Sequence, residues 1–342
     1  MTSKPRILNI VRPNDWDMLF TPATRDALNE LGEMAYRGQE RMSSEELAEM
    51  LPGYDFLLGG WGTPRFTDEV LAAAADQLKL YAHSAGSVKG ILPPAVFEQG
   101  ITVTHGARAI AYAVADMCVS LIWTMLRQTH KMDAALKSGA SWNDAKNAAI
   151  GLTAGIGHEF IGQRVGVLGA GHTGRTFIQL IRRLDCEVWV YDPYLSEEAA
   201  AKLGARKAEL DAVLSQCPIV SCQLPTTDET FRMIGARELA LLQNGAIFCN
   251  TARSRVIDMD ALLAELQTGR FQAALDVFDE EPLPEESPFR QLNNAILTPH
   301  VAGATVEARQ RQGQFMVDEM RRFLSGEPLL YQVTGDMLAT MA

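Results

Sequence analysis

Three polar residues follow candidate strands late in the chain: Arg253, Glu281 and His300. In open α/β sheets, ligands bind outside the carboxyl ends of the strands, so these side chains are expected to share one site. A histidine can exchange a proton with an oxygen near neutral pH, and a carboxylate beside it can hold the ring and favour its charged form. An arginine can bind a carboxylate through two parallel hydrogen bonds. The set would suit protonation of a carbonyl oxygen on a small carboxylic acid.

A glycine motif lies upstream of these residues. Gly169, Gly171 and Gly174 form Gly-x-Gly-x-x-Gly directly after the apolar segment Arg164–Leu168, and Asp192 ends the next apolar segment. The first glycine permits a tight turn, the second lets the backbone approach a pyrophosphate, and the third lets the following helix pack on the strand. Asp192 would bind ribose hydroxyls and repel a 2′-phosphate, which favours NAD over NADP. This context predicts a NAD-binding Rossmann domain, and the alternative is a domain of this fold that has lost its nucleotide.

The elements that must position these residues alternate along the chain. Apolar, β-branched segments alternate with segments of helical period, which predicts parallel sheets covered by helices on both faces. The candidate strands are Arg6–Val11, Asp55–Gly59, Leu78–His83, Ile101–Thr104, Arg164–Leu168, Glu187–Tyr191, Ile219–Gln223, Ala246–Asn250, Ala273–Asp276 and Ala295–Leu297. The candidate helices are Ser44–Met50, Asp68–Ala75, a long one from about Arg108 to Leu136, Thr173–Leu184, Glu197–Leu203, Leu210–Ser215, Ala236–Leu241, Met259–Gly269 and Val306–Ser325. The glycine-rich segment Gly151–Gly162 is predicted to be a loop.

Composition narrows the class of protein. The 342 residues favour two domains, and the net charge of −11 argues against a nucleic-acid or anionic-membrane surface. The apolar stretch Ala109–Leu126 contains Asp116, Ser120 and Thr124, which favours a buried helix over a membrane span. The five cysteines lie in apolar segments without a Cys-x-x-Cys pair, and the amino-terminal segment lacks the apolar core of a signal peptide. We therefore expect a cytoplasmic protein with reduced cysteines and no metal site.

The order of these motifs resembles the D-isomer-specific 2-hydroxyacid dehydrogenase family. The resemblance covers about residues 78–322 and is strongest over 162–303. Its landmarks are the glycine motif, Tyr191-Asp192-Pro193, Leu224-Pro225-Thr226-Thr227, Asn250-Thr251-Ala252-Arg253, Leu275-Asp276-Val277-Phe278, Glu281-Pro282 and Thr298-Pro299-His300. The resemblance implies NAD-dependent hydride transfer between a small 2-keto acid and its D-2-hydroxy acid.

The resemblance also implies roles for individual residues. Arg253 would bind the substrate, Glu281 would orient His300, and His300 would be the general acid/base. Asp276 would hold the nicotinamide carboxamide, and Thr251 and Ala252 would line the nicotinamide side. The remaining expected contacts are Gly169, Gly171, His172, Thr173, Gly174, Asp192, Leu224, Pro225, Thr230 and His300 for the cofactor, and Gly86, Ser87 and Val88, through their backbone N–H groups, for the substrate carboxylate.

The expected architecture is two doubly wound α/β domains. The Rossmann domain, residues 108–303, would be inserted into a flavodoxin-like substrate domain of residues 1–107 and 304–342. The cleft between them would hold the site, and closure would exclude water. The family resemblance further implies a homodimer with the long helix from Arg108 at its interface.

Several alternatives remain open at this stage. One is a non-enzymatic NAD(H)-sensing regulator on the same fold, and another is a dehydrogenase of a different small acid, of the phosphite or formate type. The loop Ser84–Lys89 departs from the family pattern, which leaves the identity of the acid open. His83 and His105 could face the site, although a structural role is favoured, and Trp61 is balanced between packing and walling the substrate pocket.

Overall fold

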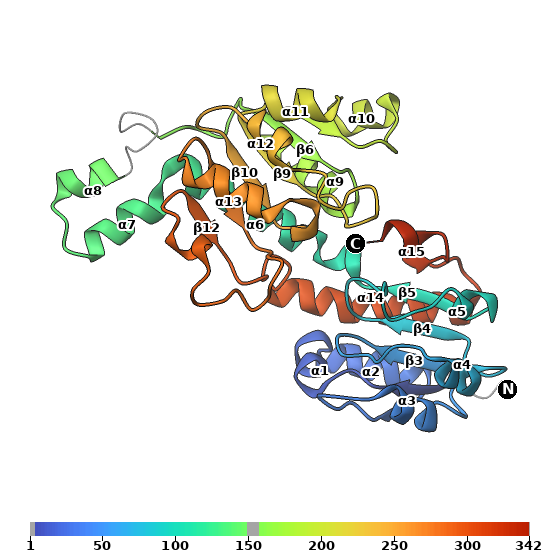
Figure 1. Cartoon of the computed structure of the whole chain (residues 1–342). Coiled ribbons are helices and arrows are strands. Elements are labelled where there is room, and N and C mark those ends of the chain that lie inside the picture. The colour runs from blue at the N-terminus through green and yellow to red at the C-terminus, as the bar shows by residue number, and fades with distance from the viewer. Residues whose placement is uncertain (1–3, 149–156, 342) are drawn as a thin grey trace. The chain divides into compact units, whose positions relative to one another are not determined.

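The computed structural model describes residues 4–148 and 157–341, and the chain divides into two compact units. Unit 1 comprises Met1–Ile110 and Ala304–Ala342, and unit 2 comprises Ala111–Gly303 (Figure 1). Each unit is built on one sheet whose strands run parallel, apart from a short added strand in unit 1. The predicted fold class, two parallel-sheet α/β domains, is confirmed. Of the predicted loop Gly151–Gly162, residues 151–156 lie outside the described residues, and residues 157–162 form neither helix nor strand.

The sheet of unit 1 has the strand order β13-β5-β4-β3-β1-β2. Its strands are short apolar segments, and the last, β13, pairs antiparallel with β5. The chain order of the parallel strands, 2-1-3-4-5, is that of a flavodoxin-like sheet. The strands are β1 (Arg6–Asn9), β2 (Glu33–Tyr36), β3 (Phe56–Gly59), β4 (Leu80–His83), β5 (Thr102–His105) and β13 (Gln332–Val333).

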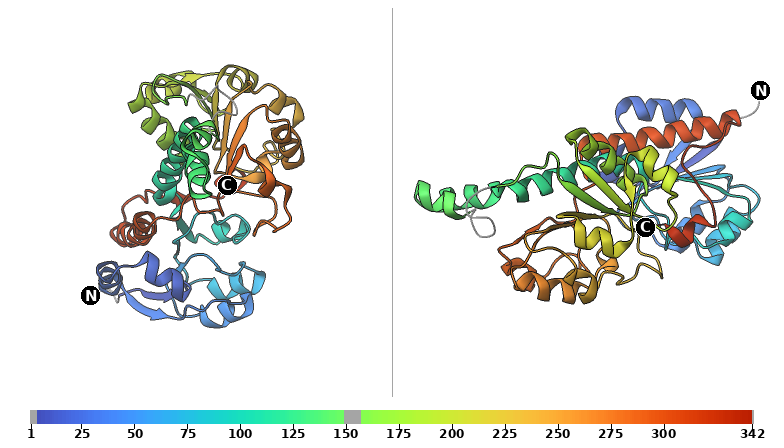
Figure 2. Two further views of the ribbon diagram at one scale, coloured as in Figure 1. Left: turned by 90° about the vertical axis from the view of Figure 1, so that its left-hand side faces the viewer. Right: turned by 90° about the horizontal axis from the view of Figure 1, so that it is seen from above.

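Helices cover both faces of this sheet. One face packs against α1, α2 and α14, which lie side by side (Figure 2), and the other against α3, α4 and α5. Two separate apolar cores result, one on each side of the sheet. The helices are α1 (Pro13–Leu19), α2 (Pro22–Leu31), α3 (Ser44–Met50), α4 (Asp68–Ala74), α5 (Ala95–Glu98), α14 (Val306–Ser325) and α15 (Met337–Thr340).

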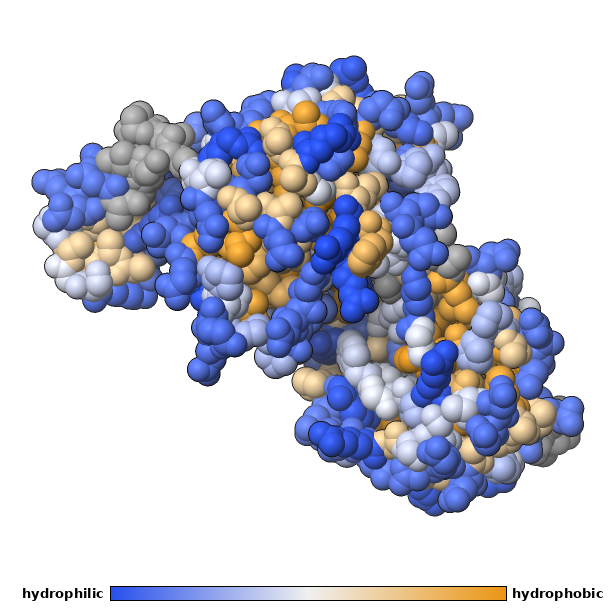
Figure 3. All heavy atoms as spheres, in the orientation of Figure 1, coloured by the Kyte–Doolittle hydropathy of each residue, from blue (hydrophilic) through white to orange (hydrophobic). Residues whose placement is uncertain are grey.

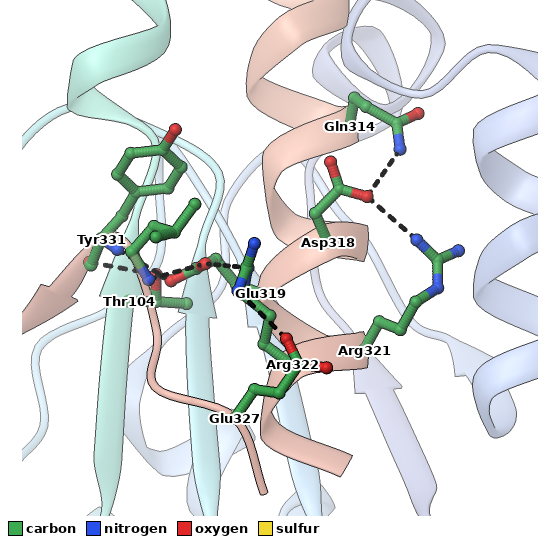
Figure 4. Close-up of polar contacts among 9 residues, drawn as sticks. Thr104, Gln314, Asp318, Glu319, Arg321, Arg322, Glu327 and Tyr331 are labelled. Carbon is green, nitrogen blue, oxygen red and sulfur yellow. Dashed lines mark hydrogen bonds and ion pairs between the residues drawn. The ribbon is translucent and has the colours of Figure 1, made fainter. Parts of the chain in front are cut away.

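A buried carboxylate ties the carboxyl-terminal segment to the sheet. Glu319 of α14 is fully buried and accepts hydrogen bonds from Thr104 Oγ1 (3.1 Å), Leu330 N (3.0 Å) and Tyr331 N (2.9 Å) (Figure 4). These three donors come from β5 and from the segment that leads into β13, so one side chain joins three parts of unit 1. A buried charge is tolerated when its lone pairs are satisfied in this way.

The sheet of unit 2 has the strand order β12-β11-β10-β9-β6-β7-β8, and all its strands are parallel. The order reverses direction between β6 and β9, which creates the switch point where ligands bind in open α/β sheets. The strands are β6 (Arg164–Leu168), β7 (Glu187–Tyr191), β8 (Arg206–Lys207), β9 (Ile219–Cys222), β10 (Ile247–Asn250), β11 (Gln272–Leu275) and β12 (Ala295–Leu297).

Helices again bury both faces. The residues of α6, α9 and α10 pack in one core and those of α11, α12 and α13 in the other. The helices are α6 (Ala107–Arg127), α7 (Thr129–Lys137), α8 (Trp142–Ala148), α9 (His172–Ile181), α10 (Glu197–Leu203), α11 (Leu210–Gln216), α12 (Ala236–Ala240) and α13 (Met259–Gln267), with 3₁₀ turns at Arg182–Leu184, Ser254–Val256 and Pro288–Gln291.

The long helix predicted from Arg108 to Leu136 is wrong as a single element. Gln128 adopts a left-handed conformation (φ 52°) between α6 and α7 and interrupts the helix. Its buried amide Nε2 donates to Gln272 Oε1 (2.5 Å), a residue 144 positions away, so tertiary contact overrides local helix preference. Within the described residues, α6 is the one helix long and apolar enough to span a membrane, and just over half of that window is buried inside the protein, as in a core helix.

Candidate active site

The glycine motif forms the turn from β6 into α9. Gly169 has φ +96°, a conformation that favours glycine, and a Cβ there would lie 2.9 Å from Gln223 O. A Cβ on Gly174 would lie 2.1 Å from Gly169 O, so the helix can approach the turn only because this residue lacks a side chain. A Cβ on Gly171 would meet nothing within 4 Å, which leaves the space in front of the α9 N-terminus open.

The start of α9 can therefore hold a pyrophosphate. The N-cap residue of α9 is Gly171, which has no side chain that could cap the helix, and the helix dipole favours an anion at this end. Arg175 Nε donates to Ala170 O (2.7 Å) and braces the turn. The residues present fit a dinucleotide.

Asp192 lies at the carboxyl end of β7, as the ribose-binding acid of a dinucleotide site does. Its Oδ2 accepts from Ala170 N (2.7 Å) and its Oδ1 from Tyr194 N (2.9 Å). The carboxylate is thus anchored to the phosphate-binding turn while its remaining lone pairs can meet ribose hydroxyls.

The other expected cofactor residues lie at the ends of β9 and β10. Leu224 is buried, and Thr230 Oγ1 donates to Pro225 O (2.6 Å), which closes the loop after β9. The Thr251 hydroxyl faces the core, where it lies 2.9 Å from Cys118 Sγ. Asn250, which the sequence did not single out, holds the next turn because its Oδ1 accepts from Ala252 N (3.0 Å).

Glu281 and His300 form a hydrogen-bonded pair. Glu281 Oε2 lies 2.7 Å from His300 Nδ1, and Glu281 Oε1 accepts from Phe278 N (2.9 Å). The carboxylate is therefore fixed by the backbone while it fixes the ring, which leaves Nε2 of His300 for a substrate oxygen. Both side chains are partly exposed, His300 at 52% and Glu281 at 36%.

Arg253 lies at the carboxyl end of β10 in the same unit. Asn250 Nδ2 donates to Arg253 O (3.0 Å), and Arg253 Nη1 donates to Ala252 O (2.7 Å). Burial lowers the pKa of Arg253, and the Glu281 charge opposes that shift. This guanidinium stays charged at neutral pH and is poorly hydrated, a state that favours binding a carboxylate.

Asp276 is fully buried and supports the His300 segment. Its Oδ1 accepts from Thr298 Oγ1 (2.5 Å) and Val301 N (3.0 Å), and its Oδ2 accepts from Ala302 N (2.9 Å). His300 has φ 54°, a strained conformation for a residue with a side chain, and these bonds hold the segment that carries it. The expected contact of Asp276 with a nicotinamide carboxamide stays a prediction.

The expected substrate loop Gly86–Val88 belongs to unit 1, at the carboxyl end of β4. Two histidines support it. His105 Nδ1 donates to Gly86 O (2.6 Å), and His83, which is bonded to Tyr81 Oη through Nδ1 (2.7 Å), also bonds to the Ser87 backbone. Burial lowers the pKa of His83 to about 3 and also lowers that of His105, so both rings are neutral at physiological pH.

Unit 2 has two large cavities, at opposite edges of its sheet. One of about 560 Å³ is lined by Glu281 and His300 together with apolar side chains that include Phe278 and Leu283. A larger one, of about 890 Å³, lies at the opposite edge of the sheet, beside the amino ends of β9, β10 and β11. Because ligands of such sheets bind at the carboxyl edge, the smaller cavity is the candidate for the active site.

A Rossmann-type sheet, an open glycine turn and a Glu–His pair with a neighbouring arginine define a nicotinamide-dependent dehydrogenase domain. The family model for the D-isomer specific 2-hydroxyacid dehydrogenase NAD binding domain matches residues 119–302. The chain belongs to this family, and unit 2 is its NAD-binding domain.

Individual relatives agree with this assignment. The chain is 32% identical to glyoxylate reductase of Thermofilum pendens over 83% of each chain, and 30% identical to D-3-phosphoglycerate dehydrogenase of Methanocaldococcus jannaschii over 91% of this chain and 57% of that protein. It thus spans little more than half the length of the phosphoglycerate dehydrogenases that it matches. The structure of D-mandelate dehydrogenase of Rhodotorula graminis has the same fold, with a TM-score of 0.84 at 21% identity, covering 96% of this chain and 97% of that one.

Proposed function

We propose that the protein is an NAD-dependent dehydrogenase that interconverts a small 2-keto acid and its D-2-hydroxy acid. The observation that carries the proposal is the 2.7 Å contact between Glu281 and His300 in the same unit as the dinucleotide turn, with Arg253 at the neighbouring strand end. The relatives named glyoxylate reductase and D-3-phosphoglycerate dehydrogenase act on acids of this class, which supports the same substrate class here.

In this mechanism each side chain has one task. Arg253 binds the substrate carboxylate and orients the carbonyl. His300, held by Glu281, donates a proton from Nε2 to the carbonyl oxygen in reduction and accepts it back in oxidation. NADH, when bound at the α9 turn, supplies the hydride that C2 receives. The D configuration of the product follows from the family and is part of the proposal.

The experiment is NADH consumption by the purified protein with glyoxylate, hydroxypyruvate, pyruvate, phenylpyruvate, 2-ketoisocaproate and oxaloacetate, with NADPH in parallel. Saturable turnover with NADH on any of these acids supports the proposal. Chiral analysis of the product tests the configuration. NADH binding with no turnover on the whole panel would instead favour a regulator that senses NAD(H).

We further propose that the protein is a cytoplasmic homodimer that associates through unit 2. Helices α7 and α8 extend from α6 and carry exposed apolar residues, with Leu136 at 45% and Trp142 at 77% exposure, and apolar side chains gather over α7 (Figure 3). Exposed apolar patches of this kind mark association surfaces. Light scattering on a sizing column tests the dimer, and Trp142→Glu should shift the protein towards the monomer.

The five free cysteines support a reducing compartment, and fractionation of the native cell tests it.

A further inference from the structure

Gln223 is the first residue after β9, at the carboxyl edge of the unit 2 sheet. Its backbone N–H donates to the carbonyl of Leu168 (2.7 Å), the last residue of β6, so it lies where the strand order reverses. The glycine turn packs against it, because a Cβ on Gly169 would lie 2.9 Å from Gln223 O and one on Gly174 would lie 3.5 Å from Gln223 Cβ. Gln223 thus borders the turn that can hold a pyrophosphate.

The side-chain amide of Gln223 is hydrogen-bonded through one of its two polar atoms. The residue is 8% exposed, and its Nε2 donates to Ser221 Oγ (2.9 Å) and to Cys118 Sγ of α6 (3.2 Å). Its Oε1 is buried and has no hydrogen-bond partner within residues 4–148 and 157–341. A buried acceptor that lacks a donor is unfavourable, so a donor from a ligand would lower the free energy of this group.

The strand order assigns Gln223 to one half of a dinucleotide. A dinucleotide lies across the switch point, with its pyrophosphate at the glycine turn between the two halves. Asp192, at the end of β7 on one side of β6, is the acid expected to bind the adenosine ribose. Gln223 lies on the other side of β6, where the nicotinamide half would extend. The first hydrogen-bond donors beyond the pyrophosphate on that half are the hydroxyls of the nicotinamide ribose.

We propose that Gln223 is a cofactor-binding residue whose Oε1 accepts a hydrogen bond from a hydroxyl of the nicotinamide ribose. Ser221 and Cys118 hold the amide through its Nε2, so the side chain is fixed before the cofactor binds. Binding of NAD(H) then satisfies the remaining acceptor of a buried amide. The inference goes beyond the proposed function, because it concerns the cofactor and is independent of which acid is the substrate.

The test uses three ligands that extend along the dinucleotide in steps. ADP ends at the pyrophosphate, ADP-ribose adds the second ribose with its hydroxyls, and NADH adds the dihydronicotinamide ring. Calorimetric titration gives a Kd for each ligand without turnover. The variants are Gln223→Met, whose side chain has nearly the same length and lacks the amide, and the control Gln267→Met, at an exposed position of α13 in the same unit.

Gln223→Met should raise the Kd for ADP-ribose and the Kd for NADH by the same factor, about 5- to 30-fold, as expected when a buried hydrogen bond is lost. The Kd for ADP should stay within about twofold of the wild-type value, because ADP does not reach beyond the glycine turn. The unchanged ADP affinity also shows that the variant is folded around this turn. Gln267→Met should bind all three ligands as wild type does.

Three results would overturn the inference. An equal loss of affinity for all three ligands would mean that Gln223 only supports the glycine turn. An unchanged Kd for ADP-ribose would exclude the ribose hydroxyl as the donor, even if NADH bound more weakly. Absence of wild-type binding to all three ligands would remove the dinucleotide site itself. The panel of 2-keto acids is a separate experiment: no turnover on any acid, together with the expected titrations, would refute the proposed substrate class and support this inference.

Discussion

Acid should weaken unit 1 through His83, because the ring is fully buried beside Tyr81 and burial lowers its pKa to about 3. In the unfolded chain the same ring titrates near pH 6.5. Below that value the unfolded chain binds a proton that the folded chain excludes, so the stabilisation is complete above about pH 6.5 and is lost as the pH falls. Each pH unit below about 6.5 lowers the free energy of unfolding by about 1.4 kcal/mol. At pH 5, about 1.5 units lower, the loss from His83 alone is therefore about 2 kcal/mol.

The matched perturbation is His83→Gln, which removes the titration and keeps a neutral hydrogen-bonding side chain. Hydrogen exchange of peptides from β3, β4 and β5 across a urea series, at pH 7 and pH 5, reports the free energy of unfolding of unit 1 by itself. The variant should lose about 2 kcal/mol less than wild type over this pH step, whatever its stability at pH 7. Burial also lowers the pKa of His105, so part of the pH dependence of the unfolding free energy remains in the variant. The control His158→Gln, at an exposed position, should show the same change of unfolding free energy between pH 7 and pH 5 as wild type. An identical change in His83→Gln and wild type would refute a neutral buried His83 ring.

Three further predictions concern the cofactor turn and the carboxyl-terminal segment. Gly174→Ala forces a Cβ against the Gly169 carbonyl, so NADH affinity should fall at least tenfold by fluorescence titration, and an unchanged affinity would contradict the close packing. Asp192→Ala removes a charged hydrogen-bond acceptor and should raise the Kd for NADH about 10- to 100-fold. The ratio of the Kd values for NADPH and NADH, measured in parallel titrations, should fall. An unchanged ratio would contradict the role of Asp192 in selecting NAD. Glu319→Gln places a donor against backbone N–H groups in a buried site and should lower the free energy of unfolding, measured in urea, by about 1–3 kcal/mol. The control Asp318→Asn, at a more exposed position of the same helix, should change it by no more than about 0.5 kcal/mol. Equal effects of the two substitutions would contradict the buried network.

Local pattern was sufficient for the strands that carry the site. The segments Arg164–Leu168, Glu187–Tyr191 and Ala295–Leu297 were predicted with the bounds that the structure has. The first two are mostly buried, and buried parallel strands are apolar runs bounded by turn residues. The edge strand β2 (Glu33–Tyr36) was missed because it begins with a charged residue and contains no β-branched residue. The two-residue strands β8 and β13 were missed as well, and so short a segment has no periodicity to detect.

The same limit applies to the site. Glycines, acids and a histidine at strand ends have a local signature, so Gly169, Asp192, Glu281 and His300 could be selected from the sequence. The stacking of Arg309 on Trp61 could not be predicted, because the two residues lie far apart in the chain. The support that Asp276 gives to the His300 segment likewise becomes visible only when the carboxylate meets its three donors in space.

The central claim is that His300, held by Glu281, exchanges the proton during hydride transfer to a 2-keto acid. The most direct measurement is single-turnover NADH oxidation with the best acid of the panel, in wild type and in His300→Gln, with NADH affinity measured on the same samples. The account predicts a rate lower by about 10²–10⁴-fold in the variant and an unchanged affinity for NADH. A variant that oxidises NADH at nearly the wild-type rate would contradict the account.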